Sequence, residues 1–242
     1  KYCKSIHIFQ LGKLRIGFNL LRGFFSGLPF QVAYFYSPGV ASAIRKLVHT
    51  EKYDRIFCQL IRTSEYVRDL PEIPAVIDFM DIFSKGVERR IPKVNPFMRL
   101  LFRMELKRLL RYENKVFSRF AERVIISEQD RDLIPHPDRK HTHVIYNGVD
   151  TDFFYPQQTE KKYTILFNGN MNYPPNIESA EYLVRKILPL VHQSHPEVTV
   201  LISGATPAAR ILALQSEKVT VSGWVEDVRT SFASSQMLVA PM

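Results

Sequence analysis

Short apolar runs recur along the whole chain, separated by stretches with helical or polar patterns. The runs lie at residues 5–9, 55–60, 75–79, 124–126, 144–146, 164–167, 198–202, 219–221 and 237–240. They are rich in Ile and Val and are bounded by turn-forming or polar residues. Such runs are typical of buried strands in a parallel sheet, where both faces are covered. The pattern therefore predicts strands at these positions, beginning with residues 5–9.

Helical patterns fall between many of these runs. Residues 37–50 contain a Pro at the position where a helix would start, and residues 95–120 form a long amphipathic stretch. Residues 178–192 carry apolar side chains at helical spacing. Alternation of strand and helix predicts an α/β fold with parallel sheets.

Residues 147–162 have the composition of a boundary between two such units. They contain Asn147-Gly148, Pro156 and a polar run, and a fresh series of strands and helices begins after them. We therefore predict two Rossmann-like domains, at residues 1–155 and 156–242. A complete unit of this kind has five or six strands, and the second shows four. The chain also starts at Lys1 and stops within an apolar run, so we expect it to be truncated at both ends.

The composition of the 242 residues, 45% hydrophobic and 24% charged, is that of an ordinary globular protein. It excludes a disordered chain, a collagen and a small disulfide scaffold. The two cysteines, the absence of an Asn-x-Ser/Thr sequon and the lack of an apolar run of membrane-spanning length predict a cytoplasmic protein. The formal charge of +9 indicates an anionic partner, which the charge alone does not identify.

Most of the excess positive charge falls within residues 85–123, which hold 12 Lys or Arg and 4 Glu. Arg99, Arg103, Lys107 and Arg111 recur at every fourth position and would form a basic stripe on a helix. The stripe is either a solvated surface or a peripheral contact with the anionic inner face of the cell membrane. Nucleic acid is disfavoured, because the stretch has no recognition motif and no interleaved stacking aromatics.

A second segment has interfacial character. Residues 12–30 combine Lys13, Arg15 and Arg22 with several Leu and Phe, and glycines punctuate the run. The pattern fits a segment that lies at a membrane surface. A buried helix and loop fits it at least as well.

A glycine turn follows the predicted strand at residues 164–167. Gly169, Asn170 and Asn172 lie in a polar loop before a helix, where ligands bind in doubly wound sheets. The helix start near residues 177–178 would favour a phosphate. The alternative is a plain strand-to-helix connection, since the loop matches neither GxGxxG nor a Walker motif.

Several motifs together resemble the GT-B glycosyltransferases of family 4, also called group 1, and most closely the exopolysaccharide-associated sugar transferases. The motifs are the loop at residues 167–176, Asn147-Gly148-Val149-Asp150, Ser203-Gly204 and Ser222-Gly223-Trp224-Val225. The resemblance is strong from Arg123 onward and at residues 75–84, and diffuse elsewhere.

This resemblance implies two Rossmann-like domains with a donor cleft between them, and a nucleotide-sugar held by the C-terminal domain. It implies donor contacts at Gly169, Asn170, Asn172, Gly204, Gly223, Trp224, Val225 and Asp227, and a hinge or cleft position for Asn147 and Gly148. Trp224 would lie near the nucleotide base or, alternatively, in the core. Asp227 is a ligand contact or a helix cap. The resemblance implies no cofactor, because the nucleotide-sugar is a substrate, and no metal, because GT-B enzymes generally do not depend on a bound one.

The sequence departs from the family pattern at two places. Where many members carry Arg and Lys for the diphosphate, this chain has Asn170 and Pro175. Where many carry a His facing the donor sugar, it has Asp78 and Asp81. These carboxylates would bind sugar hydroxyls or accept the acceptor's proton, with Asp81 preferred, or one of them would cap the next helix.

The resulting hypothesis is a hexosyltransferase that moves a sugar from a UDP- or GDP-sugar to a polysaccharide or lipid-linked acceptor in exopolysaccharide biosynthesis. The fragment itself is expected to be inactive. The alternatives are a non-catalytic nucleotide-sugar-binding fragment and a sugar-nucleotide epimerase of the same fold. The nucleotide, the sugar and the acceptor stay open.

Overall fold

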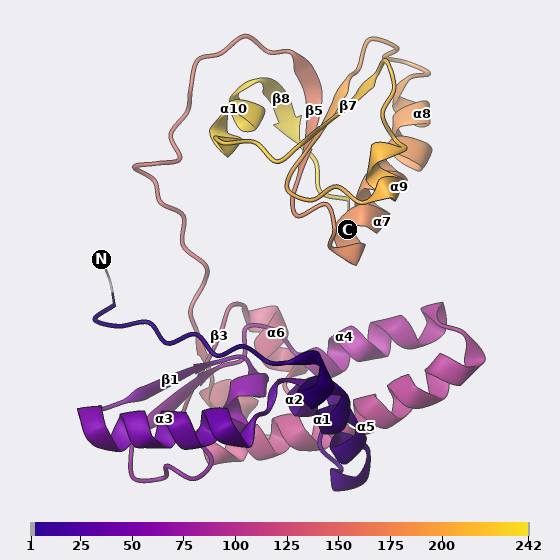
Figure 1. Cartoon of the computed structure of the whole chain (residues 1–242). Coiled ribbons are helices and arrows are strands. Elements are labelled where there is room, and N and C mark those ends of the chain that lie inside the picture. The colour runs from indigo at the N-terminus through magenta and orange to yellow at the C-terminus, as the bar shows by residue number, and fades with distance from the viewer. Residues whose placement is uncertain (1–2, 242) are drawn as a thin grey trace. The chain divides into compact units, whose positions relative to one another are not determined.

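The computed structural model describes residues 3–241, which fall into two compact units that divide between Gly148 and Val149. Each unit is built on a parallel four-stranded sheet with flanking helices (Figure 1). The predicted α/β class with two parallel-sheet units is therefore confirmed. The division falls within the polar stretch at residues 147–162, and contacts group residues 149–155 with the second unit.

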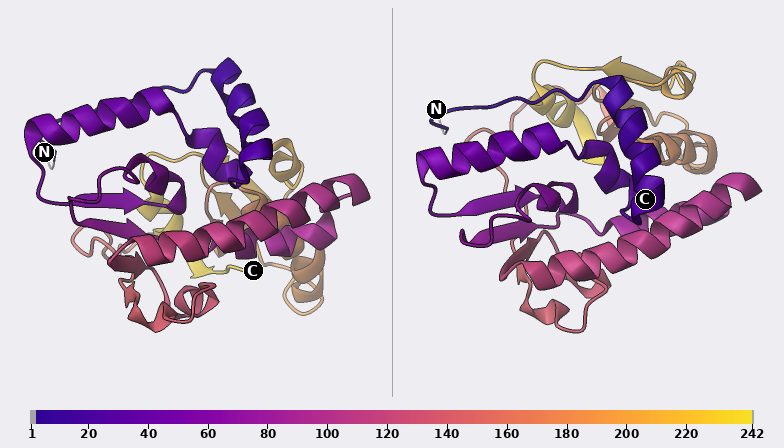
Figure 2. Two further views of the ribbon diagram at one scale, coloured as in Figure 1. Left: turned by 90° about the horizontal axis from the view of Figure 1, so that it is seen from below. Right: turned by 60° about the horizontal axis from the view of Figure 1, so that its bottom comes forward.

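The first unit has the strand order β1-β2-β3-β4. Its elements are α1 (Lys13–Ser26), α2 (Phe30–Phe35), α3 (Pro38–Glu51), β1 (Ile56–Gln59), η1 (Ile61–Tyr66), β2 (Ala75–Asp78), α4 (Phe83–Arg90), η2 (Ile91–Lys93), α5 (Pro96–Arg119), β3 (Glu122–Ile125), α6 (Glu128–Leu133), η3 (Arg139–His141) and β4 (His143–Val144). Figure 2 shows α3 and α5 on opposite sides of the sheet. Its core joins Ile77 of β2 and Ile125 of β3 to Leu109 and Val116 of α5.

The starts of α3 and α5 follow directly from local sequence. Ser37 accepts a hydrogen bond from the backbone N–H of Val40 over 3.4 Å, and Asn95 accepts one from Met98 over 2.9 Å. A proline occupies the first turn of each helix, where its missing N–H costs nothing. Both helices were predicted within two residues of their observed ends.

The strand predicted at residues 5–9 is wrong. The segment is irregular, and Ile6 and Ile8 are 77% and 84% exposed. Among the described residues no strand pairs with it, and β1 is the edge of its sheet. An alternating pattern becomes a strand only where a ladder partner and a buried face are present, and this segment has neither.

Helix α5 caps two other helices with buried carboxylates. Glu105 accepts hydrogen bonds from the backbone N–H groups of Phe30 (2.7 Å) and Gln31 (3.1 Å), at the start of α2. Glu113 accepts one from Ser84 over 2.9 Å, in the first turn of α4. The residues that precede these helices provide no side-chain cap of their own. The carboxylates therefore satisfy N–H groups that would otherwise be orphaned.

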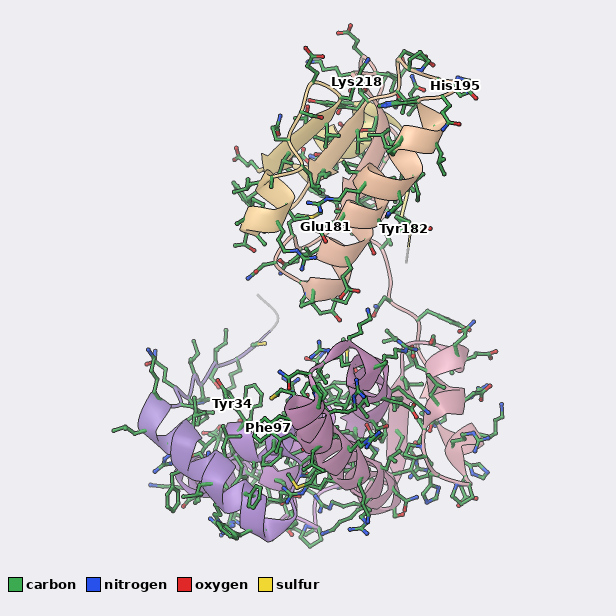
Figure 3. All side chains as sticks on the ribbon, turned by 90° about the vertical axis from the view of Figure 1, so that its right-hand side faces the viewer. Tyr34, Phe97, Glu181, Tyr182, His195 and Lys218 are labelled. Atoms are coloured by element: carbon green, nitrogen blue, oxygen red, sulfur yellow. The ribbon has the colours of Figure 1, made fainter. Side chains whose placement is uncertain are left out.

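The second unit has the strand order β7-β6-β5-β8, with every pair parallel. Its elements are β5 (Tyr163–Asn168), α7 (Pro174–Tyr182), the π-helical turn η4 (Leu183–Ile187), α8 (Leu188–Val191), β6 (Val200–Ser203), α9 (Ala209–Leu212), β7 (Val219–Gly223), α10 (Val228–Ala233) and β8 (Ser235–Leu238). Helices α7 to α9 lie on one side of the strands and α10 on the other (Figure 1). Glu181 on α7 (Figure 3) pairs with Arg210 on α9.

The helix predicted at residues 178–192 differs from the observed one. It begins earlier, at Pro174, because consecutive prolines fit the first turn. Its middle widens into η4, in which the N–H of Leu188 bonds to the carbonyl of Leu183. Pro189 follows at once and has no N–H to continue the regular ladder. The widened turn thus lies where the proline interrupts the helix.

Candidate functional site

Three glycines meet at the carboxyl ends of β5, β6 and β7 in the second unit. The N–H of Gly169 donates to the carbonyl of Ser203 over 3.1 Å, and the N–H of Gly204 donates to Gly223 over 2.9 Å. The structure thus brings together the glycines that the sequence placed at three separate strand ends. Ligands of doubly wound sheets bind at this edge.

Gly204 is the most constrained of the three. Its φ is +147°, and an added Cβ would lie 1.6 Å from the carbonyl oxygen of Gly169. No side chain fits at that distance, so the two strand ends approach each other closely only because this residue is glycine. Gly223, with φ +68°, also has a conformation that favours glycine. The carboxyl ends of β5, β6 and β7 at these three glycines, which we call the glycine edge, therefore carry no side chain, so a ligand can approach the backbone.

An asparagine network shapes the loop after β5. The side-chain oxygen of Asn170 accepts hydrogen bonds from the N–H of Asn172 (3.0 Å) and the hydroxyl of Thr206 (3.3 Å). The side-chain amide of Asn176 donates to the carbonyl of Asn170 over 3.0 Å. Asn170 and Asn172 are both exposed. Polar side chains therefore surround the glycine edge.

The start of α7 does not form the anion site expected near residues 177–178. The helix begins with Pro174 and Pro175, which have no N–H. The N–H groups of Asn176 and Ile177 are bonded to the carbonyl of Tyr173, at 3.0 and 3.1 Å. A helix terminus binds phosphate through free N–H groups. In the first turn of α7 these groups are either absent, at the two prolines, or already bonded to the carbonyl of Tyr173.

Trp224 follows β7 and is 70% exposed, so the core position considered for it is wrong. Val225, next along the loop, is half-buried. An exposed indole beside bare backbone provides a surface on which a planar ring can stack. A contact between Trp224 and a nucleotide base stays a prediction.

Asp227 caps α10 and is bound within the protein. Its side chain accepts from the N–H of Arg229 over 2.9 Å and pairs with the Arg229 guanidinium, Nη2 lying 2.7 Å from Oδ2. The guanidinium lowers the pKa of the carboxyl below its ordinary value. Of the two roles predicted for Asp227, the cap is the one that the structure contains.

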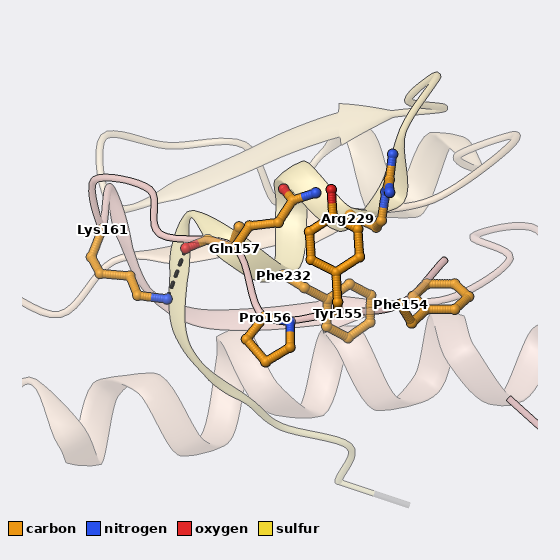
Figure 4. A pocket seen from close by; sticks show the side chains of 8 residues that line it. Phe154, Tyr155, Pro156, Gln157, Lys161, Arg229 and Phe232 are labelled. Atoms are coloured by element: carbon orange, nitrogen blue, oxygen red, sulfur yellow. Dashed lines mark hydrogen bonds between the residues drawn. The ribbon is translucent and has the colours of Figure 1, made fainter. Parts of the chain in front are cut away.

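The segment that leads into the second unit packs beside α10 (Figure 4). Arg229 donates to the carbonyl of Phe153 over 3.1 Å, with its guanidinium 4.0 Å from the centre of the Phe153 ring. Lys161 donates to the carbonyls of Ala233 and Ser235, at 2.7 and 2.8 Å. A cavity of about 360 Å³ lies here, lined in part by Phe154, Tyr155 and Phe232. Both cations thus hold the segment in place.

In the first unit, Asp78 and Asp81 flank a strained turn after β2. The side chain of Asp78 accepts from the N–H of Met80 over 2.9 Å, and Met80 has φ +56°. At the neighbouring end of β1, Leu60 has φ +67°. Such left-handed residues other than glycine cost free energy and cluster at functional sites. Asp81 is exposed, whereas Asp78 is half-buried and engaged in the turn.

Glu113 lies close enough to this turn to interact with it electrostatically, and the sequence reasoning missed it. Its side chain is fully buried, and burial raises the pKa of its carboxyl to about 7, with a smaller contribution from the negative charge of Asp81. A signal was present: Glu105 and Glu113 are eight residues apart, which puts both on one face of a helix. The prediction for residues 95–120 gave only an amphipathic helix and did not single out these two carboxylates.

The remaining predicted positions are spread over the chain. Asn147 and Gly148 are exposed and follow β4. On α5, Arg103, Lys107 and Arg111 are exposed, whereas Arg99 is half-buried. Within residues 3–241, no cluster of three His, Cys, Asp or Glu side chains is arranged to hold a metal ion. In the same part of the chain, no helix is both long and apolar enough to cross a membrane.

The second unit matches a known protein family. Residues 162–242 match a family described as glycosyl transferases group 1. The match begins one residue before β5 and covers all four strands of the second sheet. A search of curated proteins gave no match.

Two solved structures share the fold. Sucrose-phosphate synthase from Thermosynechococcus elongatus has a TM-score of 0.60 at 13% identity, over 85% of this chain and 55% of that one. A UDP-forming α,α-trehalose-phosphate synthase from Burkholderia xenovorans has a TM-score of 0.50 at 11% identity, over 93% and 64%. This chain therefore spans less than two thirds of either protein. These two structures show the fold, and the glycosyl transferases group 1 match concerns the second unit.

Proposed function

We propose that the chain is part of a GT-B hexosyltransferase that moves a sugar from a UDP- or GDP-sugar to a polysaccharide or lipid-linked acceptor, as in exopolysaccharide biosynthesis. The proposal rests on one observation, which is that the family match and the three glycines fall on the same strands of the second unit. The glycosyltransferase match covers the same strands whose ends bring Gly169, Gly204 and Gly223 together. The UDP-forming relative supports a nucleoside diphosphate as the leaving group.

In this proposal the second unit holds the donor. The bare backbone at Gly169 and Gly204 lets the diphosphate approach closely, and Asn170 and Asn172 supply amide donors. The base stacks on Trp224, which is exposed beside the same edge. Stabilisation of the leaving diphosphate then relies on fixed dipoles, which act strongly where water is excluded.

The transfer itself exchanges one bond for another. The acceptor hydroxyl oxygen bonds to the anomeric carbon, and the bond from that carbon to the diphosphate oxygen breaks. The electron pair leaves with the nucleoside diphosphate, and the hydroxyl proton passes to a carboxylate. Asp81 is the proposed base, because its side chain is exposed where that of Asp78 is engaged in the turn. The proposal requires no resident cofactor.

Titration of Trp224 fluorescence with UDP and GDP tests donor binding. We expect one of the two to quench the emission of this single tryptophan. The variant Asn172→Asp should weaken binding about tenfold, which corresponds to ~1.4 kcal/mol, since a carboxylate repels the diphosphate. Gln193→Glu is the matched control: it adds the same charge before β6, at the opposite edge of the sheet. Equal weakening by both variants, or quenching by neither nucleotide, would contradict the proposal.

Product analysis separates transfer from the alternatives. With donor and acceptor both present, a transferase releases nucleoside diphosphate and forms a glycoside. A sugar-nucleotide epimerase changes the donor sugar without an acceptor, and a non-catalytic binding protein leaves the donor intact. Because the chain covers only part of its structural relatives, the assay should use the complete gene product.

A further inference from the structure

Helix α1 presents an apolar face to solvent. Leu14, Phe18, Leu21 and Phe25, which we call the α1 stripe, are 94%, 65%, 61% and 80% exposed. At about 100° per residue, these positions lie within roughly 60° of one another around the helix. The residues of α1 that are buried are Asn19 and Gly23, one polar and one without a side chain. The usual orientation of a surface helix is therefore reversed.

Specific contacts hold α1 in this orientation. The side-chain amide of Asn19 donates to the carbonyl of Tyr36 over 2.5 Å. A Cβ on Gly23 would lie 2.7 Å from that of Ala33, so α1 and α2 are in close contact there. At the far end of α1, the guanidinium of Arg108 donates to the carbonyls of residues 23, 24 and 28, at 2.9, 2.7 and 3.1 Å. These bonds leave the α1 stripe no inward-facing alternative.

The charges around the α1 stripe have one sign. The first fifty residues contain no Asp or Glu. Lys13 and Arg22 are exposed and lie on the two flanks of the stripe, about 100° and 80° from Leu14 around the helix. Glu65 and Glu105 pack near α1, but both are buried: Glu65 pairs with Arg68 and Arg119, and Glu105 caps α2. An apolar face of Leu and Phe between cations has the chemistry that complements an anionic lipid surface.

We propose that α1 lies on an anionic membrane, with the α1 stripe at the boundary of headgroups and acyl chains and Lys13 and Arg22 at lipid phosphates. A solvated helix would expose its polar side instead. A second copy of the chain is disfavoured, because two such basic faces repel each other. Binding of α1 to a membrane would bring the proposed transfer to the surface where a lipid-linked acceptor lies. The binding itself does not depend on catalytic activity.

Sedimentation with vesicles tests the proposal without donor or acceptor. The chain should bind vesicles of phosphatidylcholine with 30% phosphatidylglycerol at low salt, and bind pure phosphatidylcholine more weakly. The triple variant Leu14→Ser, Phe18→Ser, Leu21→Ser should lose about a hundredfold in partitioning, from roughly fivefold for each side chain. The control Leu190→Ser, Leu212→Ser removes exposed leucines from the second unit and should bind as the unaltered chain does.

A second readout places the contact on the helix itself. Phe25→Trp should add an emission band that shifts to shorter wavelength with anionic vesicles, above the background of Trp224. Circular dichroism establishes that the variants are folded. Three results would overturn the proposal: equal binding by the triple variant, loss of binding only on removing Arg103 and Lys107 of α5, or a dimer that the triple variant dissociates.

Discussion

The buried carboxyl of Glu113 makes the stability of the first unit depend on pH. Burial and the charge of Asp81 raise its pKa from 4.5 to about 7 in the folded protein. A raised pKa means that the folded state holds its proton to higher pH than the unfolded chain. The stability that this group contributes is fully present below pH 4.5 and is lost as the pH rises through 7.

The size of the effect follows from the two pKa values. A change from 4.5 to about 7 corresponds to ~3 kcal/mol above pH 7, as an upper bound. Glu113→Gln removes the charge and keeps an oxygen for the N–H of Ser84. Its NH₂ group replaces Oε2, a buried atom without a hydrogen-bond partner, and this offsets part of the gain. We therefore expect the variant to be more stable by about 1–3 kcal/mol at pH 8 and close to unchanged at pH 4.5.

Urea unfolding measured between pH 4.5 and 8 by far-ultraviolet circular dichroism tests this expectation. Glu72→Gln, which removes an exposed carboxyl before β2, is the control and should show no such trend. Glu113→Ala should be destabilised at every pH, since α4 loses its cap. A constant difference between Glu113→Gln and the unaltered protein across the pH range would refute the assignment of a buried, proton-binding carboxyl.

Two further predictions concern the second unit. Gly204→Ala should destabilise it by about 4 kcal/mol, read from Trp224 fluorescence in urea, because the new Cβ collides with a carbonyl oxygen and φ is unfavourable. Gly86→Ala, inside α4 with open space around it, should instead stabilise its unit by about 1 kcal/mol; a loss at both sites would count against the steric argument. Arg229→Ala should raise the pKa of Asp227 toward its ordinary value, measured by NMR, and speed chymotrypsin cleavage at residues 153–155. An unchanged pKa would show that the pair does not persist in solution.

The sequence predicted the architecture because each buried strand can be recognised from its own residues. Apolar β-branched runs such as those in β2 and β6 are covered on both faces, and their composition shows it. Residues 5–9 have a similar apolar pattern but form no strand, since a pattern of side chains does not reveal whether a neighbouring strand exists. Strand pairing depends on two segments, and the pattern of one segment carries no information about its partner.

The resemblance to a known family singled out Gly204 as a donor contact, and its role in binding stays a prediction. The structure adds a physical reason for glycine at this position, because a strand end that close to its neighbour tolerates no side chain. Glu113 could not be singled out in this way, since its role depends on α4, which lies about 30 residues away in the chain. Likewise the sequence left Asp227 open as a ligand contact or a helix cap, and its pairing with Arg229 became visible only in the structure. Side chains that act through distant partners are recognised only once the chain is folded.

The cap that α5 provides for α2 has a consequence for the newly made chain. The N–H of Phe30 bonds to Glu105, which follows it by 75 residues. At about 5–20 residues per second, a ribosome needs roughly 4–15 s to produce the second partner after the first. Through that interval α2 has no cap, and Arg108 has not yet bonded to the end of α1. The apolar residues of both helices therefore lack the contacts that fix them in the folded chain. Helices α1 and α2 therefore complete their contacts only after this part of α5 has been made.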